Sequence, residues 1–199
     1  EQGLDEAMIR REVAFFMQAA SHSSANAMVH AFHEITAWCN EHPEDRSRID
    51  EDPFFLQRCV HESLRLHPAS PVAWRAAQCP FHLPDGDVVE SGDSVVIDLE
   101  SANRQQDLFG NDADQFNPHR SLADRIPPYG LTFGVGIHTC FGRDLAGGAL
   151  PKKDSARDSH HYGTLTSLLR SLFSHGVRPD PQASPTLDAV TQRNHWGSY

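Results

Sequence analysis

Residues 133–142 read FGVGIHTCFG, a glycine-punctuated stretch that contains a single cysteine, Cys140, just before a helical pattern opens at 144–146. Only the thiolate form of cysteine is a strong metal ligand, and the free N–H groups at a helix start favour that anion. Glycines let backbone amides approach the sulfur closely, while Phe133 supplies an apolar wall and His138 a polar group. The stretch therefore predicts a metal-binding thiolate loop. A glycine-rich turn around a buried structural cysteine is the alternative.

The bulk composition is that of an ordinary globular chain. It has 199 residues, of which 39% are hydrophobic and 22% charged, so one domain, or two, is expected. A net charge of −10 gives nucleic-acid binding no electrostatic support. No apolar run approaches the ~20 residues that span a membrane, and no secretory segment opens the sequence. These features predict a cytoplasmic protein without a membrane or nucleic-acid partner.

The other metal-ligating residue types are scattered along the chain. No C-x-x-C pair occurs, so a zinc site is not expected, and Cys39, Cys59 and Cys79 are interpreted as small buried hydrophobes. The adjacent pair His160-His161 is interpreted as part of a solvated loop rather than a metal site.

Two long helices are expected in the first third of the chain. Apolar residues recur at three- and four-residue steps over 6–42, and Pro43 ends the pattern. Such a helix would be ~55 Å long, which indicates a body larger than this chain provides. Pro53 opens a second helix over 54–67, and Pro68 ends it.

Short β-like runs follow at 71–76, 87–90 and 94–99, with a turn at 84–87. Shorter helices are expected near 101–105, 144–150 and 165–173, with a polar insertion between the last two and a β-like tail over 186–199. The fold class is therefore mainly α with small β-sheets.

Three motifs, in order, carry a family resemblance. Glu62 and Arg65 form an E-x-x-R pair, which taken alone is more often a surface ion pair. Here it is followed by Leu66-His67-Pro68 and, ~50 residues later, by Phe116-Asn117-Pro118-His119-Arg120. Together with the F-x-x-G-x-x-x-C-x-G loop, this order resembles the cytochrome P450 family. The resemblance implies that residues 1–199 are the C-terminal heme-binding half of that fold.

The resemblance also implies roles for individual residues. Cys140 would be the axial ligand of heme b, and Glu62, Arg65 and Arg120 a buried network behind the heme. Arg75 and His138 match positions that meet the heme propionates. The cofactor-binding set implied by the resemblance is Phe133, Gly136, His138, Cys140, Gly142 and Arg75.

The long first helix departs from the family's A-G-x-[DE]-T-[TS] motif. Residues 19–24 read AASHSS, so His22 stands in place of the acid and Ser23 in place of the threonine. His22, Ser23 and Ser24 are the candidates for proton transfer to dioxygen, although His22 merely packing against its surroundings is an equal alternative. The implied substrate pocket comprises Ala19, Ala20, Val72, Ala73, His195 and Trp196.

Family members are roughly twice this length, and the part without a counterpart here is the N-terminal half. We therefore expect a heterodimer with a complementary N-terminal polypeptide, which is either a separate subunit or the other piece of one longer protein. The insertion over 151–163 carries Lys152, Lys153 and Arg157. It could contact an acidic ferredoxin or the partner half, although a disordered loop is the favoured interpretation.

The predicted function is that of a heme-thiolate monooxygenase. It would hydroxylate a small organic or natural-product substrate with dioxygen and with electrons from a separate ferredoxin-type donor. The alternatives are a heme-thiolate peroxygenase, dehydratase or isomerase, and a non-catalytic heme-binding subunit.

Overall fold

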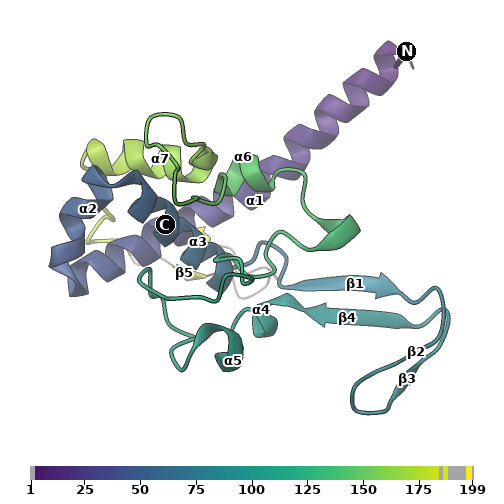
Figure 1. The fold of residues 1–199 in the computed structure, drawn as a ribbon. Helices are drawn as coiled ribbons and strands as arrows, with labels where there is room; N and C mark the ends of the chain where they lie inside the picture. Colours follow the sequence, from purple (N-terminus) through teal and green to yellow (C-terminus); the bar gives the residue numbers. More distant parts are fainter. Residues whose placement is uncertain (1–2, 184–185, 188–195, 199) are drawn as a thin grey trace.

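The computed structural model describes residues 3–183, 186–187 and 196–198, and its arrangement is drawn in Figure 1. Helix α1 (Glu6–Glu41) begins where the Asp5 carboxylate accepts a hydrogen bond from the backbone of Met8, and it ends just before Pro43. A 3₁₀ turn, η1 (Pro43–Asp45), and helix α2 (Arg46–Glu51) lead into α3 (Pro53–Leu66). Pro53 is the first residue of α3, so the predicted starts and ends of both long helices are confirmed to within one or two residues.

The core lies where the second half of α1 packs against α2, α3 and α7 (Gly163–Ser174). Nearly all side chains of α3 are buried, polar as well as apolar, because the helix is covered on nearly all sides. The residues that form this core cluster are Ala27, Ala31, Phe32, Ile35, Cys39, Ile49, Phe55, Leu56, Cys59, Val60, Leu64, Tyr129, Phe133, Leu165, Leu169 and Phe173.

The first half of α1 projects from this body (Figure 1). Its side chains are exposed, including those of Phe15, Phe16 and Met17, the last with 70% of its surface accessible. This is the apolar surface that the length of the helix predicted.

A two-stranded arm projects on the same side of the view in Figure 1. Strand β1 (Val72–Ala76) pairs antiparallel with β4 (Ser94–Asp98), and the tip pairs β2 (Phe81–His82) with β3 (Val88–Val89). The runs predicted at 71–76, 87–90 and 94–99 are confirmed, whereas β2, the partner of β3, was not predicted. Trp74 on the arm is exposed.

Short elements connect the arm to the rest of the core. Helices α4 (Leu99–Ala102) and α5 (Gln106–Phe109) replace the single helix expected near 101–105. The 3₁₀ turn η2 (Gly136–His138) and helix α6 (Arg143–Gly147) flank Cys140, and the tail pairs β5 (Thr186–Leu187) with β6 (Trp196–Ser198). None of the helices in the described part of the chain is long and apolar enough to cross a membrane.

Candidate heme-thiolate site

The loop at 133–142 is closed at its base by backbone hydrogen bonds. The Cys140 amide donates to the Phe133 carbonyl oxygen at 2.7 Å, so the loop begins and ends at one point. Gly134 has a φ of +67°, and a Cβ at that position would lie 2.6 Å from the His138 carbonyl oxygen. The turn therefore requires a glycine there.

The surface around the Cys140 thiol is apolar and open. Cys140 itself is exposed, and the neighbouring side chains of Ile137 and Phe141 have 96% and 95% of their surface accessible. Val135 and Leu145 are exposed as well. An apolar cofactor that covered these side chains would remove their surface from water. The alternative interpretation, a buried structural cysteine, is therefore wrong for Cys140.

The donor set fits a cofactor that supplies most of its own metal ligands. Within the described ranges, no group of three or more histidine, cysteine or acidic side chains is placed to hold a metal ion. One accessible thiol in an apolar surround suits the iron of a heme, whose ring provides the equatorial nitrogens and whose axial ligand is one protein side chain. The residues present thus fit heme b.

Behind the loop, the three residues of the E-x-x-R and P-x-R motifs meet in one buried network. Arg65 donates to both oxygens of the Glu62 carboxylate at 2.9 and 2.7 Å, and Arg120 Nε donates to the same group at 3.1 Å. The Arg65 side chain is fully buried, and the Glu62 and Arg120 side chains nearly so. A carboxylate bridged by two guanidinium groups is geometrically rigid, which fixes α3 against the segment that carries Arg120.

Asn103 belongs to the same network and was not assigned a role from the sequence. Arg65 donates to its carbonyl oxygen at 2.6 Å, and its side-chain amide donates back to the Arg65 carbonyl oxygen at 3.0 Å. Its Oδ1 accepts from the Leu131 amide at 2.7 Å, just before the cysteine loop. These contacts join Asn103 to backbone groups 28 and 38 residues away, and no sequence pattern marks such contacts.

A second buried hub holds the segment that contains Arg120. The Asp45 carboxylate accepts from Trp38 Nε1 at 2.9 Å, from His119 Nε2 at 2.6 Å and from Arg48 Nη1 at 2.9 Å. Burial alone would raise the pKa of Asp45, but the hydrogen bonds from His119, Trp38 and Arg48 hold that pKa below its usual value. No sequence pattern marks this hub, because its members are spread over 82 positions, from Trp38 to His119.

His61 links α3 to the end of α6. Its ring is buried, and Nε2 lies 2.7 Å from the Gly147 carbonyl oxygen, so Nε2 must carry the proton of a neutral imidazole. Burial is the main cause that lowers the pKa of His61 to about 4.

We expect this depressed pKa to make stability fall in mild acid. Between about pH 6.5 and pH 4 the unfolded chain protonates His61 and the folded chain does not, so acid favours unfolding. From pH 7 to pH 5 the loss attributable to His61 should be about 2 kcal/mol. Urea unfolding of the native chain and of His61→Gln at the two pH values checks this. A pH dependence identical in both proteins would contradict it.

The insertion after α6 is an ordered loop packed on α3. Gly148 and Gly163, both with a φ of +81°, lie so close that a Cβ on Gly163 would be 2.3 Å from the Gly148 nitrogen. The loop between them therefore leaves and returns at one point. His160 Nε2 lies 3.1 Å from Gln57 Oε1, and its ring stands 4.8 Å from that of Phe54.

Three expectations about these regions are corrected. The interpretation of 151–163 as a disordered loop is wrong. The interpretation of His160 as part of a solvated loop is wrong as well, because its side chain is half-buried against α3. Arg157 is engaged within the chain, with Nη2 3.3 Å from Asp52 Oδ1, while Lys152 and Lys153 are exposed. Cys79 is exposed rather than buried, because it lies in the arm and not in the core.

The residues expected at the oxygen and substrate side lie on two separate projecting elements. Ala19, Ala20 and His22 are exposed on α1, and the Ser23 hydroxyl donates to the Ala19 carbonyl oxygen at 3.0 Å; Ser24 is half-buried. Val72 and Ala73 are half-buried on β1.

The remaining expected residues of the site add few contacts. The Arg75 guanidinium donates to the Trp74 carbonyl oxygen at 2.7 Å, while His138 and Gly136 are exposed and Gly142 half-buried in the cysteine loop. His195 lies outside the described residues, and for Trp196 only the backbone is described.

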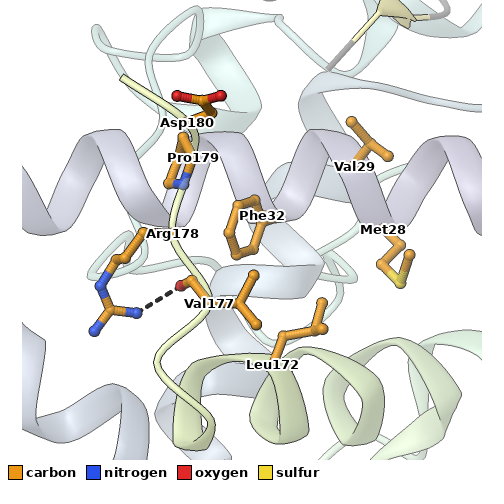
Figure 2. A pocket seen from close by; sticks show the side chains of 8 residues that line it. All are labelled: Met28, Val29, Phe32, Leu172, Val177, Arg178, Pro179 and Asp180. Atoms are coloured by element: carbon orange, nitrogen blue, oxygen red, sulfur yellow. Dashed lines mark hydrogen bonds between the residues drawn. The ribbon is translucent and has the colours of Figure 1, made fainter. Parts of the chain in front are cut away.

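A cavity of about 350 Å³ opens elsewhere, between α1, α7 and residues 177–180 (Figure 2). Phe32, Leu172 and Val177 form its apolar lining, and Arg178 and Asp180 stand beside it. None of the residues expected in the substrate pocket lines this cavity. It belongs to the packing between α1 and α7 and is separate from the cysteine loop.

Comparison with known proteins agrees with this geometry. The family model for cytochrome P450 matches residues 54–149. The chain is 31% identical over 166 residues to cyclooctat-9-en-7-ol 5-monooxygenase of Streptomyces melanosporofaciens, covering 73% of this chain and 35% of that protein. It is 34% identical over 105 residues to mycinamicin VIII C21 methyl hydroxylase of Micromonospora griseorubida, covering 53% and 25%.

The fold is shared with solved structures. The cytochrome P450 enzyme CYP109B1 from Bacillus subtilis superposes with a TM-score of 0.71 at 21% identity, over 98% of this chain and 46% of that one. CYP154A1 from Streptomyces coelicolor A3(2) gives a TM-score of 0.65 at 22% identity, over 92% and 41%. The chain thus spans about a third of the curated relatives' length and under half of the solved structures. Members of this family bind heme b, and the chain belongs to the cytochrome P450 family.

Proposed function

We propose that this chain is the heme-binding part of a monooxygenase in which Cys140 is the axial ligand. The observation that carries the proposal is the exposed thiol, set in an apolar surround at the base of a closed glycine loop. A thiolate-bound heme supplies O–O bond cleavage and oxidation of C–H bonds. Relatives named as a monooxygenase and a methyl hydroxylase support the same reaction class.

The chain's own residues would hold and orient the cofactor. Phe133, Gly136 and Gly142 shape the loop, and the Arg75 and His138 side chains would donate hydrogen bonds to the heme carboxylates. The network of Glu62, Arg65 and Arg120 keeps α3 fixed behind the loop. A small organic substrate would lie beside Ala19, Ala20, Val72 and Ala73, with His195 and Trp196 as further candidates.

Proton delivery would fall to His22, Ser23 and Ser24. The Ser23 hydroxyl donates a hydrogen bond to the Ala19 carbonyl oxygen, and its oxygen lone pairs can still accept a hydrogen bond. His22 is exposed, so its imidazole nitrogens can hydrogen-bond to water. The test is to measure product formation with a reduced ferredoxin-type donor and dioxygen, and separately with hydrogen peroxide alone. The proposal predicts product in the first case and none in the second. Turnover only with peroxide favours the peroxygenase that the altered motif suggests.

We further propose that a complementary polypeptide covers the projecting half of α1. Contiguous apolar surface of this kind is either an interface or an aggregation liability. The side chains concerned are exposed along the free part of the helix: Met8, Ile9, Val13, Phe15, Phe16 and Met17. The segment that would cover them corresponds to the part of the relatives, more than half of their length, that has no counterpart in this chain.

If the projecting half of α1 is an interface, the chain without its partner should self-associate. Light scattering should find oligomers or aggregates at micromolar concentration, because the exposed apolar face has no other cover. The double variant Phe16→Ser, Met17→Ser should shift the mass toward the monomer. Arg11→Ser on the same helix is the matched control and should not. A monodisperse native monomer with full heme loading would contradict the proposal.

A further inference from the structure

Two sets of side chains on helix α3 bind two different parts of the chain. Glu62 and Arg65 form the ion-pair network, while Gln57 and His61, one turn apart, face the end of α6. Both Gln57 and His61 are buried. Among the described residues, the hydrogen bond of the buried His61 side chain goes to the end of α6 rather than to the network of Glu62.

Gln57 and His61 satisfy the carbonyl groups at the C-terminal end of α6. His61 Nε2 lies 2.7 Å from the Gly147 carbonyl oxygen, and Gln57 Nε2 lies 3.1 Å from the same oxygen. Gln57 Nε2 also lies 3.0 Å from the Ala149 carbonyl oxygen. The Gly147 carbonyl is one that a helix end leaves without an intrahelical partner, and Gly147 is buried, whereas Ala149 lies just beyond α6 and is half-buried.

Gly147 also lies against Phe133, the first residue of the cysteine loop. Gly147 packs against Phe133 so closely that an added Cβ would lie 3.2 Å from Phe133 Cε2. The Tyr129 ring stands edge-on to Phe133 at 5.0 Å and to His61 at 5.5 Å. His61 therefore contacts α6, which follows Cys140, directly. It reaches Phe133, at the start of the loop, through the Tyr129 ring.

We infer that His61, supported by Gln57, is a positioning residue that holds the two ends of the Cys140 loop in register with the ion-pair network of α3. Because Phe133 accepts the Cys140 amide hydrogen bond, a shift of Phe133 or of α6 moves the sulfur relative to α3. The inference rests on the proposed function for its consequence at the heme, while the contacts themselves involve only this chain.

The first test needs no cofactor. In His61→Leu the ring and its N–H donor are lost, and hydrogen exchange at the Cys140 amide should be about tenfold faster because the loop opens locally. Val60→Ala, at a buried neighbour on the same helix, is the matched control for a general loss of core packing. It should leave Cys140 exchange within about twofold of the native value after correction for stability.

The second test uses the heme-loaded chain. His61→Leu should lower the fraction of reduced carbon monoxide complex that shows a thiolate-ligated spectrum, whereas His61→Gln, which keeps a side-chain N–H donor, should restore it. If His61→Leu behaves like Val60→Ala in both readouts, the inference is overturned. If the native chain shows no thiolate-ligated heme, the proposed function fails instead, and amide exchange still decides on the role of His61.

Discussion

Replacement of Cys140 by alanine is expected to remove the thiolate-ligated heme signature and to lower the proposed monooxygenase turnover roughly 1000-fold, about 4 kcal/mol in activation free energy. The thiol is the sulfur ligand offered by the loop, and alanine preserves the backbone that closes on Phe133. Heme content, the spectrum of the reduced carbon monoxide complex and product formation are to be measured together.

Cys79→Ala is the matched control for Cys140→Ala. Both cysteines are exposed, but Cys79 lies in the β arm and has no part in the proposed site. Its replacement should leave heme ligation and turnover unchanged. Equal loss in both variants, or a Cys140→Ala protein with native turnover, would contradict the assignment of the ligand.

Arg65→Ala is expected to destabilise the folded chain by about 3–5 kcal/mol. Arg65 is fully buried and donates to Glu62 as well as to the carbonyl oxygens of Asn103 and Ala113. Its loss would leave a buried carboxylate with too few donors and two backbone oxygens without partners. Urea unfolding at pH 7 measures the change.

Arg10→Ala provides the comparison for Arg65→Ala. Arg10 also pairs with a glutamate on its own helix, Glu6, but both side chains are largely exposed, so the change should stay below about 1 kcal/mol. A similar small effect for Arg65→Ala would show that the network of Glu62 does not hold α3 in place.

The sequence predicted the elements whose signals are local. Pro43, Pro53 and Pro68 bound the two long helices because proline limits helices by its own backbone geometry. The pairing of Glu62 with Arg65 followed from helical spacing, and that of Arg120 only from the resemblance. The closed loop around Cys140 followed from its glycines, of which Gly134 is sterically required.

Contacts between distant residues were beyond prediction from one sequence. Gln57 and His61 bond to carbonyl groups 86 or more positions away, and a backbone oxygen carries no side-chain signal that a pattern could use. The hub at Asp45 depends in the same way on the folded path of the chain, since His119 is 74 residues distant. The insertion looked disordered because its composition is polar, yet Phe54, Gln57 and Asp52 bind it from α3 and its N-terminal flank.

The most direct measurement of the central claim is the absorption spectrum of the heme-loaded chain, reduced and saturated with carbon monoxide. The native chain should show the band of a thiolate-ligated heme, and Cys140→Ala should lose it. A band typical of histidine ligation, or one that is unchanged in Cys140→Ala, would contradict it.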